Sequence, residues 1–339
     1  MALIQIHCSY INKPPKIETI TVTPDSLGTY DRAVLRCVAS DGDNDPLNYR
    51  WKARYGTFVS GSKSDSAVWQ APSIPGLYYI RVVVSDDYDL DMDSIAIQVD
   101  QFFNMISIPP DSFTYGEGDT LKVMNQGFSI MKYEVTNQQY AKYLEEALTA
   151  GEIALSGSTL VGYYTGDENY GANYYTYIDL SDSASRISMV GPATFTIDPG
   201  YSFHPVVAVS WFGALAFADH YSLSLPTEQE WELAARGDRG YDYPWGDTDP
   251  TCEMTNYSGC RDDTQPVGRS SGVSPYGLYD MSGNVWEWTA DWYNDSLFTR
   301  VRRGGGYNNF GDALKSWFRY HSDPTGYYEA VGFRCIKRE

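Results

Sequence analysis

The chain has 339 residues, of which 42% are hydrophobic and 20% charged, a globular composition that argues against wholesale disorder, collagen and coiled coil. Its 25 Lys and Arg against 44 Asp and Glu give a net charge of −19, so its surface repels phosphate backbones and we expect no nucleic-acid partner. No apolar run approaches the ~20 residues that a membrane-spanning helix needs.

Residues 1–15 are predicted to form an N-terminal segment and linker. Their start resembles the end of a truncated bacterial lipoprotein signal, in which Cys8 would carry a lipid and attach the protein to a membrane. Gln5 and His7 fit such a signal poorly, so an ordinary N-terminus is the alternative.

Residues 16–101 are predicted to fold as an all-β sandwich, because short alternating runs are separated by Asp, Gly and Pro turns. The expected strands are 17–23, 33–39, 47–53, 66–70, 77–84 and 94–99. Cys37 and Trp51 lie where immunoglobulin-type domains place their Cys and Trp, but the 77–84 run has no second Cys. The segment resembles bacterial immunoglobulin-like or polycystic-kidney-type repeats, with Cys37 as a core residue.

Two acidic turns, 41–45 and 86–93, carry closely spaced Asp residues. Carboxylate oxygens are ligands that Ca²⁺ prefers, so calcium is one interpretation. The other is a solvated turn, because Asp and Gly are common turn formers.

Residues 102–339 are predicted to form a loop-rich α+β domain, rich in Gly, Tyr and Trp. The 3.6-residue apolar period predicts a helix over 136–148 with Thr136 as N-cap, and a second helical region from 210 to 236. Within that region Thr227 precedes Glu230 by three residues, the pattern of a capping box.

The five cysteines include one close pair, Cys252 and Cys260. A zinc site would need four ligands, and none of the four histidines is near this pair. We therefore expect a loop disulfide rather than two free thiols, which would place the protein outside the reducing cytosol.

Separated motifs across residues 102–339 resemble the formylglycine-generating enzyme (sulfatase-modifying factor) family. The matching segments are 131–140 (MKYEVTNQQY), 205–211 (PVVAVSW), 225–237 (LPTEQEWELAARG), 243–247 (YPWGD), 275–289 (PYGLYDMSGNVWEWT), 303–307 (RGGGY) and 331–335 (VGFRC). The resemblance implies a loop-rich variant of the C-type-lectin fold.

The resemblance also implies a structural calcium ion in the 280–287 segment. The matching positions are Asp280 and Glu287 by side chain and Gly283 and Val285 by backbone carbonyl. The alternative is that Asp280 and Glu287 cap local backbone amides. A second family calcium loop would fall near residues 256–263, where this sequence is shortened.

Family enzymes oxidise a substrate cysteine with O₂ at a copper ion held by two thiolates. The matching positions here are Asn309 and Leu314, so we expect no copper and no catalytic residue. The family's terminal Cys is Cys335, whose usual disulfide partner position is Ala218, so a lone buried thiol is expected. A related branch binds iron through three His, which the four scattered histidines of this chain do not reproduce.

The favoured interpretation is a non-catalytic binding or structural module of a secreted or surface-anchored, extracytoplasmic bacterial protein, with a protein, peptide or glycan ligand. The alternatives are a divergent peptide-modifying oxidase and the variable ligand-binding protein of a diversity-generating retroelement. The expected ligand-binding face comprises Tyr307, Asn308, Asn309, Trp317, Arg319, Tyr320, His321, Tyr327 and Tyr328. For Trp317 and Tyr320, the alternative is that their side chains are buried in the core.

Overall fold

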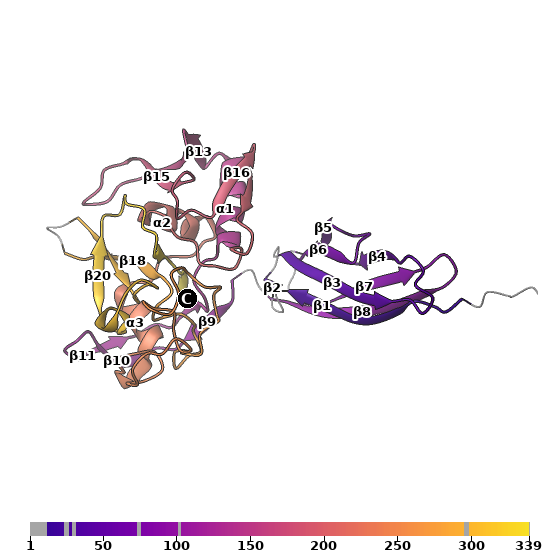
Figure 1. Cartoon of the computed structure of the whole chain (residues 1–339). Coiled ribbons are helices and arrows are strands. Elements are labelled where there is room, and N and C mark those ends of the chain that lie inside the picture. The colour runs from indigo at the N-terminus through magenta and orange to yellow at the C-terminus, as the bar shows by residue number, and fades with distance from the viewer. Residues whose placement is uncertain are drawn as a thin grey trace, which may run out of the picture. The chain divides into compact units, whose positions relative to one another are not determined.

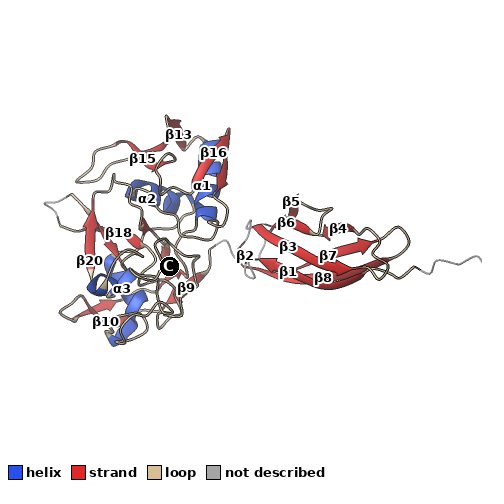
Figure 2. Cartoon of the chain, in the orientation of Figure 1, coloured by secondary structure: helices blue, strands red, loops and turns tan. Residues whose placement is uncertain are grey.

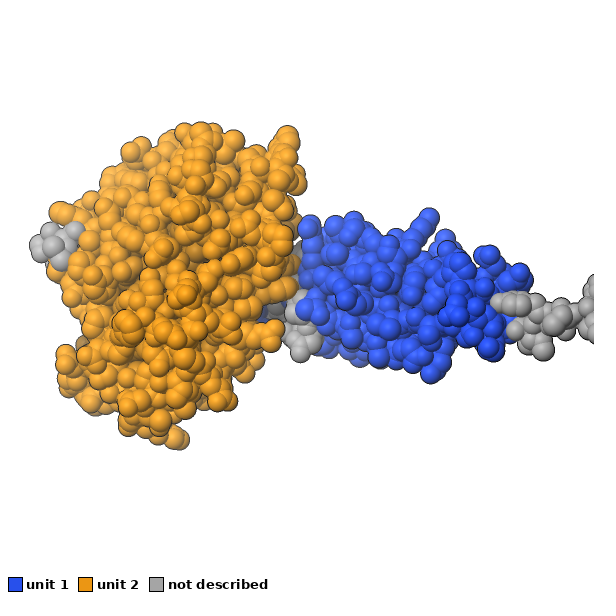
Figure 3. Space-filling view, viewed as in Figure 1, with its two compact units in different colours: residues 1–104 blue, residues 105–339 orange. Residues whose placement is uncertain are grey.

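The computed structural model describes residues 12–23, 27–28, 32–72, 76–100, 103–294 and 298–338. The chain divides into two compact units, residues 1–104 and 105–339, coloured separately in Figure 3. The expected boundary lay slightly earlier, after residue 101. Cys8 lies outside the described residues. Within the described ranges, no helix combines the length and apolarity needed to cross a membrane.

The first unit consists of two four-stranded sheets (Figure 1). One has the order β1-β3-β6-β5, formed by Lys16–Thr23, Arg32–Ser40, Ser66–Gln70 and Thr57–Ser60. The other has the order β2-β8-β7-β4, formed by Leu27–Gly28, Leu90–Asp100, Gly76–Ser85 and Asn48–Ala53. All six expected strands are present, while the short β2 and β5 were not predicted.

The two sheets of the first unit share one hydrophobic cluster. Leu35 and Trp69 come from the first sheet, and Trp51 and Val82 come from the second. Along β3 the buried and exposed residues alternate, as expected for a strand with one face on the core. Cys37 lies in this cluster, as expected, and burial raises its pKa to about 11. The first unit thus has two sheets that bury one common apolar core.

The two acidic turns use their first carboxylates to hold their own backbones. Asp41 Oδ1 accepts hydrogen bonds from the amides of Asp43 (2.8 Å) and Asp45 (2.9 Å). Asp86 Oδ1 likewise accepts from the amides of Tyr88 and Asp89. These contacts are those of the turn-forming interpretation.

The second unit mixes three α-helices with short strands and long loops within its described residues (Figure 2). The helices are α1 (Asn137–Ala150), α2 (Trp211–His220) and α3 (Glu228–Arg236), with the 3₁₀ turns η1 (Gly237–Arg239) and η2 (Gly311–Leu314). The strands are β9 (Met105–Ile108), β10 (Asp111–Tyr115), β11 (Thr120–Met124), β12 (Phe128–Met131), β13 (Ile153–Ser156), β14 (Thr159–Tyr164), β15 (Asn173–Asp179), β16 (Ile187–Gly191), β17 (Thr194–Ile197), β18 (Trp286–Trp292), β19 (Arg300–Arg303), β20 (Arg319–Ser322), β21 (Val331–Gly332) and β22 (Ile336–Arg338). The expected loop-rich α+β composition is confirmed.

Side-chain caps fix where the predicted helices begin. The amide of Gln139 donates to Thr136 Oγ1 (3.2 Å), and the Gln139 side chain accepts from the amide of Thr136 (2.9 Å). Thr227 and Glu230 form the same reciprocal pair at the start of α3. Both caps predicted from the sequence are therefore confirmed.

In the four-stranded sheet β20-β19-β18-β21, strand β20 carries three of the nine residues predicted to bind a ligand, Arg319, Tyr320 and His321. Across it, Trp288, Arg302 and Tyr320 are register partners, and Glu287, Arg303 and Arg319 are the next set. Because successive side chains of a strand point to opposite faces, these two sets lie on opposite faces of the sheet.

Candidate functional site

The positions that match the family's copper thiolates are structural here. Asn309 Oδ1 accepts hydrogen bonds from Trp286 Nε1 (2.6 Å) and from the amide of Gly306 (3.0 Å). The side chain of Leu314 is fully buried. The free thiols among the described residues are Cys37 and Cys335, both buried, and burial raises the pKa of Cys335 well above its usual value. The described residues therefore supply no thiolate pair at this position.

The Glu287 carboxylate, expected to bind calcium, is occupied by protein donors. Arg334 donates to both of its oxygens, Nε to Oε2 and Nη2 to Oε1, each at 2.7 Å. Trp231 Nε1 donates to Oε2 at 2.8 Å. Glu287 and Arg334 are fully buried, so both oxygens of this carboxylate are already used by protein donors.

The rest of the expected calcium segment surrounds buried carboxylates. Asp280 Oδ2 accepts from the amide of Gly268 (2.7 Å), as the amide-capping alternative requires. Glu134 accepts from Asn284 Nδ2 (2.9 Å) and from the amide of Val285 (3.3 Å). Burial raises the pKa values of Glu134 and Asp280, although the hydrogen bonds that they accept act in the opposite direction. In the described residues, no three His, Cys, Asp or Glu side chains form a group that could hold a metal.

Gly283, another expected calcium position, is required by the backbone. Its φ of +80° is in the left-handed region. A Cβ there would lie 2.1 Å from Thr255 Oγ1 and 2.5 Å from the carbonyl oxygen of Asn256. The close approach of these two segments therefore needs glycine, whether or not an ion is bound.

Three residues of the expected ligand-binding face are bound within the protein. Arg319 pairs with both oxygens of Glu228 on α3. Trp317 Nε1 donates to Asp242 Oδ1 (2.7 Å). His321 stacks on Tyr293, with ring centroids 4.2 Å apart. These contacts leave Arg319 without a free carboxylate-binding edge, so its expected role as a ligand anchor does not fit the structure.

On the opposite face of the sheet, three aromatic rings surround the guanidinium of Arg302. Its central carbon lies 4.9 Å from the ring centroid of Tyr320, 5.1 Å from that of Trp286 and 5.4 Å from that of Tyr328. We call these four residues the Arg302 cluster. Tyr320 is 46% exposed, and Arg302 and Tyr328 are partly buried, so the cluster is open to solvent on one side.

The Arg302 cluster is linked to Asn309, the position that matches the family's first copper thiolate. Trp286 belongs to the cluster and donates its indole N–H to Asn309. The neighbouring Asn308 donates to Glu329 Oε1 (3.3 Å), and Glu329 follows Tyr328 directly. Five of the nine expected residues therefore belong to one region: Tyr307, Asn308, Asn309, Tyr320 and Tyr328. Tyr327 directly precedes Tyr328 in the chain. Arg302 was missed, although it directly precedes the RGGGY motif.

A cavity of about 230 Å³ adjoins this region. Its lining includes Tyr307 and Glu329 together with Arg186, Asp262 and Asp263. The Arg186 guanidinium lies 3.1 Å from the Asp263 carboxylate, so this cation already has a partner.

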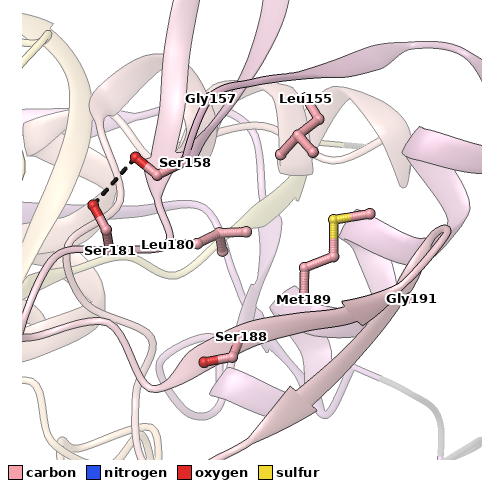
Figure 4. A pocket seen from close by; sticks show the side chains of 8 residues that line it. All are labelled: Leu155, Gly157, Ser158, Leu180, Ser181, Ser188, Met189 and Gly191. Atoms are coloured by element: carbon pink, nitrogen blue, oxygen red, sulfur yellow. Dashed lines mark hydrogen bonds between the residues drawn. The ribbon is translucent and has the colours of Figure 1, made fainter.

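A larger cavity of about 470 Å³ lies elsewhere (Figure 4). Its lining combines Leu155, Leu180 and Met189 with serines, and Ser158 and Ser181 are hydrogen-bonded at 3.2 Å. None of the expected site residues lines it, and its lining has no charged side chain.

Cys252 and Cys260 are joined by a disulfide, with Cα atoms 5.4 Å apart. The bond closes the loop that the sequence pattern predicted. These two residues are the one close pair among the five cysteines of the sequence.

Comparison with known proteins shows the family to which the chain belongs. Residues 95–339 match the sulfatase-modifying factor enzyme 1-like domain, so the chain belongs to that family. The formylglycine-generating enzyme of Thermomonospora curvata is 33% identical over 288 residues, covering 69% of this chain and 89% of that protein. The inactive C-alpha-formylglycine-generating enzyme 2 of Bos taurus is 30% identical over 273 residues, covering 69% and 88%.

A serine/threonine-protein kinase pkn1 from Chlamydia caviae is 34% identical over 234 residues, covering 64% of this chain and 34% of the kinase. The chain thus spans about a third of that relative's length. Among solved structures, CarF has a TM-score of 0.49 at 21% identity, covering 70% of this chain and 98% of that chain.

Proposed function

We propose that the second unit is a non-catalytic binding module on the sulfatase-modifying factor fold. The observation that carries this proposal is the Asn309 amide, which occupies the first thiolate position and is held by Trp286 and Gly306. An amide oxygen and the apolar Leu314 cannot replace soft thiolate ligands for Cu(I). The similarity to a relative whose name describes it as inactive supports the same conclusion.

The test is an assay for aldehyde formation. The full chain is incubated with Cu(I), O₂ and a Cys-x-Pro-x-Arg peptide, beside the Thermomonospora curvata relative as positive control. We expect the peptide mass to be unchanged with this chain and altered by the control. Aldehyde formation would overturn the proposal in favour of a divergent oxidase.

We place the module outside the cytoplasm, anchored to or released from the cell surface. The Cys252–Cys260 disulfide supports this location, because such bonds persist in oxidising compartments. The immunoglobulin-like assignment of the first unit fits the same setting. Fractionation of the producing cells should recover the chain outside the cytoplasm, and recovery only in the cytosol with both thiols reduced would contradict this location.

Calcium binding in the 280–287 segment remains a proposal, supported by the buried Asp280 oxygen Oδ1, which accepts no hydrogen bond among the described residues. A ligand that binds only the folded state adds ~2.7 kcal/mol at a hundredfold excess over Kd. Removing calcium with EDTA should lower the melting temperature of the chain, and Asp280→Ala should abolish that response. An unchanged melting temperature, with no calcium detected by elemental analysis, would contradict it.

A further inference from the structure

The Arg302 guanidinium differs from the other arginines of its sheet in having no carboxylate partner. Arg300 pairs with Asp167 at 2.6 Å, Arg303 with Glu228 and Glu232, and Arg319 with Glu228. For Arg302, no carboxylate in the described part of the chain lies within ion-pair distance. Its buried Nε lacks an acceptor there, as do those of Arg300 and Arg303, so the missing carboxylate is what distinguishes it. This lack stands out in a chain of net charge −19.

Arg300 is a close comparison, because it lies on the same strand and face two residues earlier. Its guanidinium also lies against two aromatic rings, those of Trp292 (3.4 Å) and Trp211 (3.7 Å). It nevertheless has a carboxylate, Asp167, and donates to the carbonyl of Ala290 at 2.6 Å. Arg300 thus has ring contacts and a carboxylate partner, whereas Arg302 has ring contacts alone.

The partial burial of Arg302 makes an anionic partner favourable. Burial lowers its pKa to about 10, so the group is still charged at neutral pH. A guanidinium has five N–H donors in a planar fork, and leaving a buried donor unpaired is unfavourable. The rings of Trp286, Tyr320 and Tyr328, with centroids 4.9 to 5.4 Å from the central guanidinium carbon, supply no carboxylate oxygen, so an anion has to come from a ligand.

We infer that the Arg302 cluster binds the carboxylate of a ligand, which pairs with the Arg302 fork while its apolar or aromatic body lies against Trp286, Tyr320 and Tyr328. This inference rests on the proposed binding function and specifies its ligand chemistry. A carboxylate matches the guanidinium fork with two parallel hydrogen bonds. Aromatic side chains supply the large rigid contact area typical of binding hot spots.

Single carboxylates fit this position better than polyanions. One unpaired cation can compensate one negative charge, whereas the overall charge of −19 repels a chain of phosphates or sulfates. Glu329, which follows Tyr328 in the chain, and Asp262 line the 230 Å³ cavity and add negative charge there. The expected ligand is therefore a compact monocarboxylate, either free or at the end of a peptide.

The experiment uses the full chain and four probes: 4-methylbenzoate, its neutral analogue 4-methylbenzamide, N-acetylphenylalanine and N-acetylphenylalanine amide. Binding is followed by the Nε–Hε resonance of Arg302, assigned from its loss in Arg302→Lys. We expect both carboxylates to shift this resonance and to bind at least tenfold more tightly than the matching amides. Tighter binding of N-acetylphenylalanine than of 4-methylbenzoate would indicate a peptide source.

Substitutions separate the role of Arg302 from nonspecific charge. Arg302→Gln should weaken carboxylate binding at least tenfold, and Arg302→Lys, which keeps the charge but not the fork, should restore only part of the loss. Arg269→Gln removes one exposed arginine outside the cluster and should leave the affinity unchanged. Circular dichroism and the melting temperature establish that each variant is folded.

Equal binding of acids and amides, or an unchanged affinity in Arg302→Gln, would overturn the carboxylate assignment while leaving a binding function intact. Absence of any shift of Arg302 with either carboxylate would also overturn it. The proposed lack of catalysis is tested separately by the peptide oxidation assay, so the two failures are distinguishable.

Discussion

At the scale of single residues, the second unit holds its buried charges in specific pairs. Glu287 and Arg334 form a two-bonded pair, and Arg334 also donates to the backbone carbonyls of Met131 and Tyr279. Arg303 is buried between Glu228 and Glu232. Each pair joins segments that are far apart in the sequence, so these side chains connect a domain with few long helices.

Glu287→Gln should lower the free energy of unfolding by about 3 to 5 kcal/mol, because it leaves Arg334 buried without its counter-charge. Urea denaturation gives the value, and Glu329→Gln is a matched control at an exposed carboxylate, expected to stay within about 0.5 kcal/mol of the wild type.

The same substitution separates the ion pair from calcium ligation. If Arg334 is the functional partner of Glu287, the loss is equal in EDTA and in calcium. A loss that appears only in calcium would show that Glu287 binds the ion and that the paired geometry is incomplete.

A second residue-scale prediction concerns pH. Burial first, then repulsion from Asp280 and Glu287, raises the pKa of Glu134 above its usual value, so the folded state holds this proton more tightly than the unfolded state. The stability that protonated Glu134 contributes is complete below about pH 4.5 and is lost as the pH rises through the folded pKa. The stability difference between wild type and Glu134→Gln should therefore fall from pH 4 to pH 8 in urea titrations, and a difference that rises with pH would contradict it.

At the scale of elements, the sequence predicted helix caps and strand positions, because these depend on residues close together in the chain. The N-cap at Thr136, the capping box of Thr227 and Glu230 and the six strand positions of the first unit depend on spacing within about ten residues, and all are present. That Gln139 completes a second capping box with Thr136 was not predicted. The division of the expected binding face depends instead on the pairing of β20 with β19, which sets Tyr320 beside Arg302 and Arg319 beside Arg303. Sequence proximity suggested one face for residues 317–321, whereas strand geometry separates Tyr320 from Arg319.

The contacts of Glu287 and Arg302 could not be predicted from the sequence, because they too depend on how distant segments pair. Arg334 lies 47 positions after Glu287, and nothing local indicates that the two side chains meet. The rings around Arg302 come from β18, β20 and the segment before β21. The RGGGY motif drew attention to Arg303, which is buried, rather than to its neighbour.

Thr227→Ala should destabilise the second unit by about 1 kcal/mol through loss of the α3 cap. The cap is more consequential than an isolated one because α3 also carries Glu228 and Glu232, which hold Arg303. Denaturation curves of Thr227→Ala and Thr227→Ser measure the effect. Serine keeps the capping oxygen and should retain most of the stability, and equal losses in both variants would show that packing, not capping, is responsible.

At the scale of the whole molecule, the hydrophobic clusters are separate. One lies entirely in the first unit, built from both of its sheets, and another in the second unit joins β9, β10, β12 and β22 to α3. Their members come from different halves of the domain division. Each unit therefore buries an apolar core of its own, which is the condition for folding as a domain.

This separation gives a last prediction. Leu35 is fully buried in the cluster of the first unit, so Leu35→Ala should cost about 2 to 5 kcal/mol there through lost burial and the cavity left behind. Leu233, fully buried in the cluster of the second unit, is the matched position for Leu233→Ala. Hydrogen exchange resolved by peptide can assign the loss of protection in each variant. We expect Leu35→Ala to raise exchange in β3 and β7 but leave β18 and β19 protected, with carboxylate binding at Arg302 unchanged. Leu233→Ala should raise exchange in β18 and β19, weaken carboxylate binding and leave β3 and β7 protected. Loss of protection across both units in either variant would mean that the two cores fold as one cooperative body.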